Sequence, residues 1–457
     1  MCAKPSRRFA RNWQNWSGSV QSTPREIVTP RSLDELAQRI GAYGRDSRRV
    51  RVVGGGHSFT PLVQTNDVLL SLDGLQGIQE VNGQRGTVKV WGGTRLKRLG
   101  NDLLALGRAQ ENLGDIDVQS IAGAISTGTH GTGVRFGNIA TQVVGLTLVT
   151  ATGDIAECSS DQHPDLFKAA QVSLGALGVI ASVTLRTVPA KRLRFQVRRE
   201  RVDSCLANLE RYKQENDHFE FFWLPYTPWA QAKFLNETDA PAKDGNLWGT
   251  FNKIVLENGV YWVLSEACRL APPLTQTVSK ISAQAISSST ETDYSHRLYA
   301  TPRMVRFREM EYNIPAEHFT TVLAEIRECI QQRQFKVHFP IECRFAHADD
   351  IWLSPAYQRP SSYIAVHMYR GMAYEDYFAA IEAIFRRYQG RPHWGKMHTR
   401  TADELAALYP RWDDFCQVRA TLDPQGIFLN DYLRHLFAVD APHAQHSAAF
   451  PSPHNAS

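Results

Sequence analysis

The sequence predicts an α+β protein built from two domains. Its 457 residues are enough for two or three domains, and 43% hydrophobic with 21% charged residues is typical of a globular chain. The N-terminal third alternates short β-like runs with glycine-rich turns, whereas the chain beyond about residue 195 has fewer glycines and longer helical patterns. Pro189 and the basic residues 191–194 mark the predicted boundary.

The composition argues against several classes of function. The net charge of +5 comes from 51 Lys and Arg against 46 Asp and Glu, and no basic stripe suited to nucleic acid is visible. No apolar run reaches the roughly 18 residues of a membrane span, and the basic N-terminus lacks the apolar segment of a secretory signal. The seven cysteines are scattered without a C-x-x-C pair, which predicts free thiols in a reducing cytoplasm rather than zinc ligands or disulfides.

Two helix starts can be identified in the N-terminal third. Ser32 can cap a helix, and Glu35 three residues later completes a capping box. Thr94 can cap a second helix. The apolar positions expected on one face are Leu33, Leu36 and Ile40 in the first helix and Leu96, Leu99, Leu103 and Leu106 in the second.

Strands and further helices follow from the periodicity of the remaining chain. Strands are expected at residues 50–53, 87–91, 143–150, 155–158, 182–188 and 219–223, with a hairpin turn at 151–154. Residues 316–333 and 375–389 are predicted to form amphipathic helices. The tail from residue 438 is small, polar and contains proline, so it is predicted to be disordered.

Two glycine-rich loops carry the strongest functional signal. Residues 54–58 read Gly-Gly-Gly-His-Ser after a strand, and residues 120–133 form the second loop. Glycines let backbone N–H groups approach phosphate oxygens, so the two loops predict a cradle for a diphosphate. The fingerprint G-x-G-x-x-G does not fit, because Phe59 and Phe136 stand where the third glycine should be, and no Walker A loop exists. A dinucleotide would therefore bind in another fold.

His57 is the candidate for covalent chemistry in the first loop. It follows three glycines at the end of a strand, where a loop can present it to a ligand. A neutral imidazole is a good nucleophile near neutral pH and can attack an electrophilic flavin methyl group. The alternative is a turn histidine that hydrogen-bonds a nearby carbonyl group. His130, in Gly-Thr-His-Gly, allows the same two interpretations.

The two loops together resemble the FAD-binding half of the vanillyl-alcohol-oxidase superfamily. Within it, the sequence is similar to the sugar-lactone and alditol oxidoreductases: gulonolactone, galactonolactone and arabinonolactone oxidases or dehydrogenases, and alditol oxidase. The C-terminal half carries four further matching motifs, at residues 341–345 (Ile-Glu-Cys-Arg-Phe), 350–355, 392–396 (Pro-His-Trp-Gly-Lys) and 428–433. Asn15-Trp16 also fits, and the resemblance covers about residues 12–437.

This resemblance implies a domain organisation. It predicts an FAD-binding domain of two small subdomains at residues 12–190 and an α+β substrate (cap) domain with an antiparallel sheet and flanking helices at 191–437. Residues 438–457 remain as the disordered tail. The segment around Lys396 is expected to return to the active-site cleft.

The resemblance also implies how FAD is held. In this family the histidine of the first glycine loop is bonded to the 8α carbon of the flavin, and here that residue is His57. The other residues expected to bind FAD are Val52, Val53, Gly54, Gly55, Gly56, Ser58, Ser120, Gly123, Gly128, Thr129, His130, Gly131, Gly178, Val179 and Ile180. No metal is expected.

Oxidation of a CH–OH group requires hydride transfer to flavin N5 and stabilisation of charge on the substrate oxygen. The resemblance assigns positive charge at that oxygen to Arg344 and Lys396. Glu342, two residues from Arg344 and on the same side of a strand, is expected to bind sugar hydroxyls and help remove the proton. Ser120 and His398 complete the predicted substrate contacts. From the residues alone, Glu342 and Arg344 would as readily form an ion pair on a solvated face.

Three segments favour a lactone as the substrate. The Lys-x-His ending at 396–398 and residues 217–222 and 363–371 resemble aldonolactone enzymes more than alditol oxidases. The predicted reaction is oxidation of the 2-hydroxyl of L-gulono- or D-arabinono-1,4-lactone to an ascorbate-type product, with electrons passed to O2 or another redox carrier. The alternatives are an oxidase of polyols such as xylitol or sorbitol, and a non-enzymatic flavin carrier.

Overall fold

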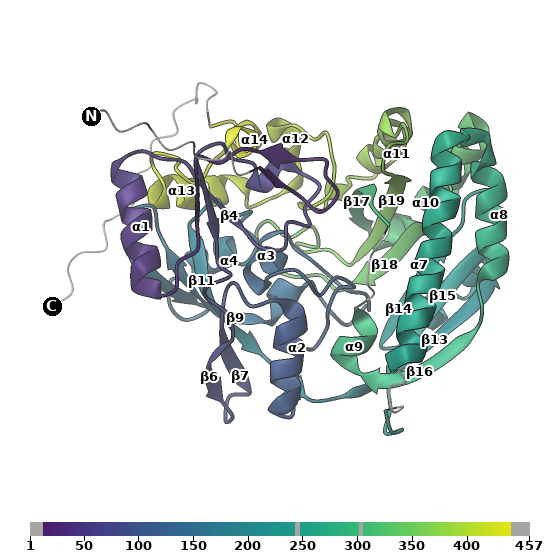
Figure 1. Cartoon of the computed structure of the whole chain (residues 1–457), viewed down its shortest axis with the longest axis horizontal. Coiled ribbons are helices and arrows are strands. Elements are labelled where there is room, and N and C mark those ends of the chain that lie inside the picture. Colours follow the sequence, from purple (N-terminus) through teal and green to yellow (C-terminus); the bar gives the residue numbers. More distant parts are fainter. Residues whose placement is uncertain (1–11, 243–246, 301–304, 440–457) are drawn as a thin grey trace, which may run out of the picture.

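The computed structural model describes residues 12–242, 247–300 and 305–439. Two groups of elements lie side by side, one formed mainly by the N-terminal part and one by residues beyond about 190 (Figure 1). From residue 440 on, the tail predicted to be disordered lies outside the described residues. None of the described helices combines the length and the apolar character needed to cross a bilayer.

The N-terminal part contains two sheets. The first is parallel and has three strands in the order β3 (Glu26–Val28), β5 (Val68–Ser71) and β4 (Val50–Val53). The second is antiparallel, with the order β10 (Ile155–Ser159), β9 (Val143–Val149), β11 (Val179–Arg186), β7 (Thr87–Trp91) and β6 (Ile78–Asn82). Helix α1 (Leu33–Arg45) buries Leu36 and Ile40 in a core shared with the parallel sheet and with Val179 of β11.

The helices of this part cover the antiparallel sheet. They are α2 (Leu96–Ala105), α3 (Ile121–Ser126) and α4 (Pro164–Gln171). Their apolar side chains share one core with strands β7, β9 and β11. The short pairs β1 (Trp13–Gln14) with β2 (Gln21–Ser22) and β8 (Arg108–Ala109) with β12 (Val188–Pro189) complete the part. The two sheets give the two small subdomains that the family resemblance implies.

The second part is built on one antiparallel sheet of eight strands. Their order is β16 (Ser289–Tyr294), β13 (Arg192–Arg201), β15 (Trp229–Glu237), β14 (His218–Trp223), β18 (Ile341–Ala346), β19 (Ser361–Tyr369), β17 (Phe307–Pro315) and β20 (Arg391–Pro392). The expected antiparallel sheet with flanking helices is therefore confirmed.

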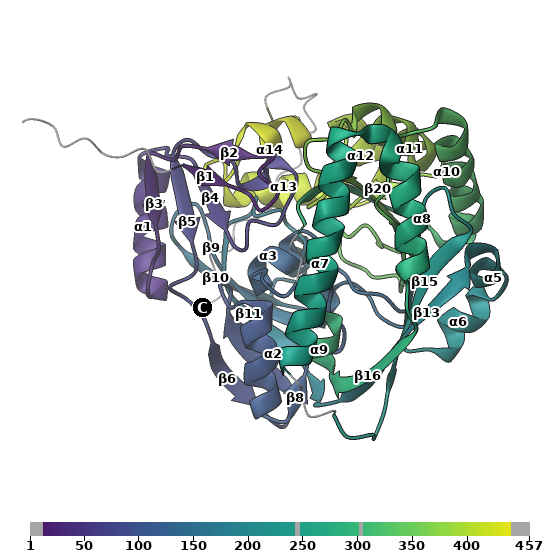
Figure 2. The same cartoon turned by 45° about the vertical axis from the view of Figure 1, so that its right-hand side comes forward.

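Helices cover this sheet, and α5 (Val202–Ala207), α6 (Leu209–Glu215), α10 (Phe319–Arg333) and α11 (Glu375–Arg387) share its main core. Helices α7 (Leu247–Leu270) and α8 (Thr275–Ala285) run alongside each other on the outside, with α9 (Ser295–Tyr299) near the N-terminal end of α7 (Figure 2).

After β20 the chain returns to the N-terminal part. Helices α12 (Ala402–Leu408), α13 (Trp412–Leu422) and α14 (Asp431–Leu436) pack in the core that contains α2 and α3. Buried Arg51 of β4 fixes this return, because its guanidinium donates hydrogen bonds to the carbonyl oxygens of Leu62, Leu174, Gly175 and Phe428. The returning chain is thus tied at Phe428 to the N-terminal part.

Most predicted elements are present, but four details were wrong. Ser32 caps α1 by accepting the Glu35 N–H, but the Glu35 carboxylate accepts the Arg31 N–H instead of the Ser32 N–H, so the predicted capping box is not completed. Thr94 does not cap α2: its hydroxyl donates to the Trp91 carbonyl at 2.7 Å, which closes the preceding turn, and Arg95 stands at the helix start. Leu106 lies beyond the last helical residue and is 44% exposed. The strand expected at 182–188 begins at Val179 and ends at Arg186, because Val179 already pairs with Val149 of β9.

Candidate functional site

A cleft in the N-terminal part follows the two glycine loops. It encloses about 880 Å³, including space open to solvent. This glycine cleft is lined mainly by residues 51–58, Gln119, Ser120, Gly123, Thr127, Gly175, Gly178 and Ile180. The end of β4, the start of α3 and the start of β11 therefore converge on one elongated site.

The glycine cleft fits a dinucleotide such as FAD. A Cβ atom added at Gly54 would lie 2.2 Å from the Ser120 Oγ, and one at Gly55 would lie 2.8 Å from the Val118 carbonyl oxygen. Only glycine therefore allows the first loop to pack so closely against the second. The backbone N–H groups of residues 55–58 donate to no acceptor among the described residues, so they are available for phosphate oxygens.

The N-terminal segment holds the first loop in place. The Trp16 N–H donates to the Gly56 carbonyl at 2.7 Å, and the Asn15 amide donates to the Ser58 carbonyl at 2.9 Å. The Trp16 ring stacks on the His57 imidazole with 5.3 Å between ring centroids. These contacts give a structural reason for the Asn-Trp motif near the start of the sequence.

His57 lies at the junction of two cavities. It lines the glycine cleft and also a second cavity, the inner pocket, of about 610 Å³. Burial, helped by the charges of Lys396 and Arg95, lowers the pKa of His57 to about 4, so the imidazole is neutral. Within the described chain the ring makes no hydrogen bond to a carbonyl group, which argues against the turn-histidine interpretation.

The inner pocket lies between the two parts of the molecule. It shares His57, Ser58, Gln119 and Thr127 with the glycine cleft. Its other lining residues are Trp16, Phe59, Asp115, Ile116, Thr129, His130, Phe307, Glu309, Glu311, Arg344, His393, Gly395 and Lys396. The pocket therefore combines charged side chains of the second part with the loop that carries His57.

Strand β17 supplies two buried carboxylates to this pocket. Glu309 and Glu311 alternate along the strand and face the same side. Glu309 forms an ion pair with Lys396, and the loop of Lys396 follows the strand, because the His393 and Met397 N–H groups donate to the carbonyls of Glu311 and Glu309. The Phe59 N–H donates to the Gly395 carbonyl at 2.7 Å, which ties this loop to the His57 loop.

These contacts determine the charge states of Glu309 and Lys396. Burial opposes ionisation of Glu309, but Lys396 and His367 outweigh it and lower the pKa of Glu309 to about 2. Burial likewise opposes the charge of Lys396, but Glu309 and Glu311 raise the pKa of the ammonium group above its ordinary value. Lys396 therefore presents a permanent positive charge in the inner pocket.

Arg344 of β18 is the second cation of the inner pocket. Its Nε donates to Glu220 at 2.8 Å, and its Nη2 forms ion pairs with Asp115, at 3.3 Å, and with Glu342. Although burial disfavours the charge, the carboxylates of Glu342, Asp115 and Glu220 raise the pKa of Arg344 well above its ordinary value. Glu342 lies on the same side of β18 but outside the lining of the inner pocket.

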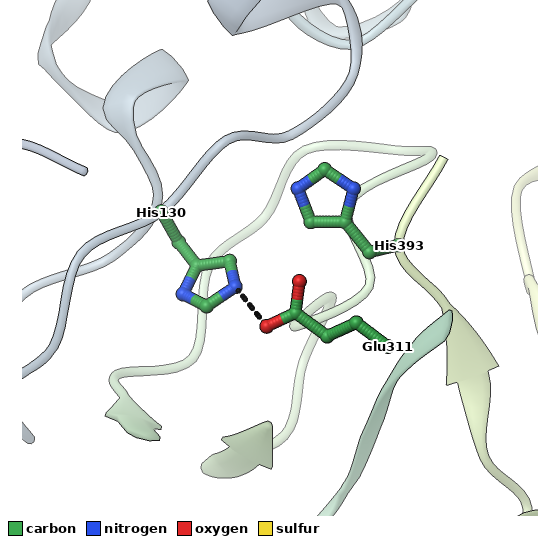
Figure 3. Close-up of side chains that lie close together, drawn as sticks. All are labelled: His130, Glu311 and His393. Atoms are coloured by element: carbon green, nitrogen blue, oxygen red, sulfur yellow. Dashed lines mark hydrogen bonds and ion pairs between the residues drawn. The ribbon is translucent and has the colours of Figure 1, made fainter. Parts of the chain in front are cut away.

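His130, Glu311 and His393 form a compact group in the inner pocket (Figure 3). One nitrogen or oxygen atom of each lies within 4.8 Å of the others, a spacing that a divalent cation could use. However, His130 is already bonded to Glu311 at 3.1 Å, and the Nδ1 of His393 accepts the Gly395 N–H at 3.0 Å. A second such group, Glu309, Glu342 and His367, has its carboxylates engaged by Lys396 and Arg344.

Most residues predicted to bind FAD line one of the two cavities. Those in the glycine cleft are Val52, Val53, Gly54, Gly55, Gly56, His57, Ser58, Ser120, Gly123, Gly178 and Ile180, and those in the inner pocket include Thr129 and His130. Gly128 and Val179 line neither. Gly131 lines a third cavity, which shares Asp115 and Arg344 with the inner pocket.

Only some of the residues predicted to contact the substrate line the inner pocket. Arg344 and Lys396 line the inner pocket. Ser120 instead lies in the glycine cleft, where its hydroxyl accepts the Gly123 N–H and caps α3. His398 is bonded to the Tyr432 hydroxyl at 3.1 Å and does not line the inner pocket. Trp394 is fully buried in the core.

The sequence did not indicate several ionisable residues of the inner pocket: Asp115, Glu309, Glu311 and His393, with Glu220 and His367 behind them. Only the alternation Glu309-Met310-Glu311 gave a signal, because two carboxylates on one face of a buried strand need partners.

The chain shows clear similarity to known protein families. The family described as D-arabinono-1,4-lactone oxidase matches residues 183–436, and the FAD binding domain matches residues 24–159. L-gulono-1,4-lactone dehydrogenase of Mycobacterium tuberculosis (strain ATCC 25618 / H37Rv) is 43% identical, and the alignment covers 92% of this chain and 98% of that protein. L-gulonolactone oxidase of Bos taurus is 32% identical, with 93% and 98% covered.

Solved structures show the same fold at low sequence identity. Cholesterol oxidase from B. sterolicum superimposes with a TM-score of 0.77 at 18% identity, and the match covers 94% of this chain and 97% of that one. This likeness concerns the fold alone.

Replacement of Gly54 by alanine should reduce bound FAD, because the new Cβ would lie 2.2 Å from the Ser120 Oγ and push the two loops apart. We expect the flavin absorbance per mole of purified protein to fall by about tenfold or more, equivalent to at least ~1.4 kcal/mol of binding. Ser120→Gly in the same chain should restore much of it. Gly83→Ala, where a Cβ meets no atom within 4 Å, is the control. Full flavin content in Gly54→Ala would contradict this packing.

Proposed function

Since the chain belongs to the D-arabinono-1,4-lactone oxidase family, we propose that it oxidises the 2-hydroxyl of a sugar 1,4-lactone with FAD as cofactor. L-gulono-1,4-lactone is the first candidate, because the relative that bears its name is 43% identical over nearly its whole length. D-arabinono-1,4-lactone is the second. The observation that carries the proposal is that Lys396 and Arg344 line the same inner pocket as His57.

The two cations suit the chemistry of alcohol oxidation. Bound FAD supplies the acceptor for the hydride that leaves the CH–OH carbon. The substrate oxygen gains negative charge as the hydride departs, and fixed positive groups in a pocket shielded from water stabilise that charge. Lys396 and Arg344 are held in place by buried carboxylates, so they need little rearrangement during the reaction.

The carboxylates of the pocket divide into two roles. Glu309 and Glu311 have pKa values well below the ordinary range, because Lys396 and His130 outweigh their burial, so they are weak proton acceptors and serve to hold these partners. Glu342 does not line the inner pocket, and we assign it to holding Arg344. Asp115 lines the pocket 3.3 Å from Arg344, and we propose it as the acceptor of the hydroxyl proton.

His57 is proposed to hold the flavin by a covalent bond to its 8α carbon. Three features support this bond: the neutral imidazole, its place where the two cavities join, and the absence of a competing carbonyl partner among the described residues. The electrons of the reaction then pass to O2 or to a separate redox carrier, and the rate of reoxidation in air distinguishes these two acceptors.

We further propose a cytoplasmic location. All six cysteines of the described residues are free, and burial raises the pKa of Cys158 and of Cys416 to about 12, which keeps these thiols unreactive. Free, scattered thiols suit a reducing compartment.

Lys396→Met should strongly reduce turnover while the flavin stays bound. Loss of the positive charge in the inner pocket should lower kcat for L-gulono-1,4-lactone by roughly a hundredfold or more, the size typical of losing one charge-stabilising group. The assay should include D-arabinono-1,4-lactone and xylitol, with O2 and an artificial dye as acceptors. Lys168→Met, which removes an ion pair between Lys168 and Asp350 in another part of the molecule, is the matched control. Unchanged turnover in Lys396→Met would contradict the proposed role.

His57→Ala should release the flavin on denaturation. In the wild-type protein we expect flavin fluorescence to remain with the chain after acid precipitation, because the bond survives unfolding. In the variant the fluorescence should appear in the supernatant. His296→Ala, which replaces a partly buried histidine of α9 bonded to Asn101, should behave like the wild type. Free flavin from the wild-type protein would contradict the covalent bond.

A further inference from the structure

Five histidines are buried among the residues whose side chains are described: His130, His218, His338, His367 and His393. A neutral imidazole has one N–H donor and one acceptor nitrogen, whereas an imidazolium ion has two donors. The partners of the two nitrogens therefore show how many protons a buried ring must carry.

Three of these rings meet a partner that can donate. The Nε2 of His218 lies 2.7 Å from the Tyr299 hydroxyl, and the Nε2 of His338 lies 3.0 Å from the Ser265 hydroxyl. The Nδ1 of His393 accepts the Gly395 N–H. Burial lowers the pKa values of His218 and His338 to about 4 and that of His393 to about 3, so one proton suffices for each ring.

His130 and His367 differ, because both nitrogens of each ring face acceptors. The Nδ1 of His130 lies 2.8 Å from the Gly131 carbonyl oxygen and its Nε2 3.1 Å from the Glu311 carboxylate. The Nδ1 of His367 lies 3.1 Å from the Pro340 carbonyl oxygen, and its Nε2 lies 3.5 Å from Glu309 and 4.0 Å from Glu342. Carbonyl oxygens and carboxylates cannot donate, so favourable contacts need a proton on every one of these nitrogens.

The surroundings of His130 favour a charged ring. Its ring is stacked on Tyr363, with 3.6 Å between the centroids and an angle of 18° between the planes, and the face of an aromatic ring attracts a cation. The side chains of His130 and Glu311 are only 2% and 4% exposed, so the ring nitrogen and the carboxylate face each other rather than water.

We propose that His130 and His367 are imidazolium ions in the working enzyme, and that they are positioning residues that fix the inner pocket through Glu311 and Glu309. Glu309 then lies between two cations, with one oxygen towards His367 and the other paired with Lys396. Glu342 likewise lies between His367 and Arg344. His367 thus connects the carboxylates that hold both cations of the reaction.

Loss of these protons would disturb the pocket. Around His367 the charged groups are Glu309 of β17 and Glu342 of β18, with Lys396 and Arg344 behind them. Around His130 the titratable groups are Glu311 of β17, Tyr363 of β19 and His393 of the loop after β20. A deprotonated Nε2 would direct a lone pair at a carboxylate, so the carboxylates and their cations would move apart as the pH rises.

The direct test is nitrogen NMR of the holoenzyme labelled with ¹⁵N-histidine at pH 7.5. We expect two rings with both nitrogens protonated, one missing in His130→Gln and the other in His367→Gln. Most exposed histidines are neutral at this pH. The wild-type spectrum alone decides the matter if a variant fails to fold: fewer than two doubly protonated rings would overturn the proposal. This readout needs no substrate, so it stands apart from the proposed lactone oxidation.

The catalytic consequence rests on that proposed function and is tested by pH profiles of kcat. His367→Gln keeps a donor but removes the charge, so we expect about tenfold lower kcat at pH 7, a loss typical of removing a supporting partner. The fall of the wild-type kcat at high pH should become shallower. His338→Gln, which alters an equally buried but neutral ring, should keep the wild-type profile. Equal profiles for both variants would contradict the positioning role.

Discussion

The inner pocket depends on two carboxylates, Glu309 and Glu311, that alternate on buried strand β17. Two carboxylates in such a position are unstable without positive partners, and the surrounding elements supply them. Lys396 pairs with Glu309 from the loop after β20, and His130 bonds to Glu311 from the second glycine loop. The same backbone carbonyls of β17 hold the Lys396 loop through hydrogen bonds from His393 and Met397. Strand β17 thus brings together groups from distant segments of the sequence. His130 and Glu311, for example, are 181 residues apart.

The site is completed by the return of the chain to the N-terminal part. The loop of Lys396 bonds to the backbone of Phe59, two residues from His57, and the helices that follow pack in the core beneath the second glycine loop. The glycine cleft and the inner pocket therefore share residues, with His57 among them. This arrangement places the proposed flavin site directly beside two fixed cations, which suits hydride transfer from an alcohol. The fold is shared with cholesterol oxidase.

The sequence predicted the parts of this account that depend on local motifs. The glycine loops, His57, Arg344 and Lys396 stand in short patterns with a chemical meaning, and the structure brings all of them to the two connected cavities. Glu309 and Glu311 were missed, because β17 lies between β19 and β20 and sequence periodicity cannot give that strand order. Asp115 was missed because it lies outside the helices and strands, so no periodic pattern indicates it. Ser120 and His398 were expected to contact the substrate, but their side chains are engaged by local contacts. Ser120 is required as a helix cap, and His398 follows the loop to Tyr432. At Thr94 the error is smaller: the hydroxyl donates a hydrogen bond within the preceding turn and is therefore not available to cap α2.

The most direct test of the central claim is anaerobic reduction of the bound flavin by L-gulono-1,4-lactone, followed by absorbance in a stopped-flow instrument. The measurement should compare the ordinary lactone with the lactone carrying deuterium at C2. If the enzyme removes a hydride from C2, the lactone bleaches the flavin rapidly and the deuterated lactone does so several times more slowly. Flavin that stays oxidised with both L-gulono- and D-arabinono-1,4-lactone, but is bleached by xylitol, would contradict the account.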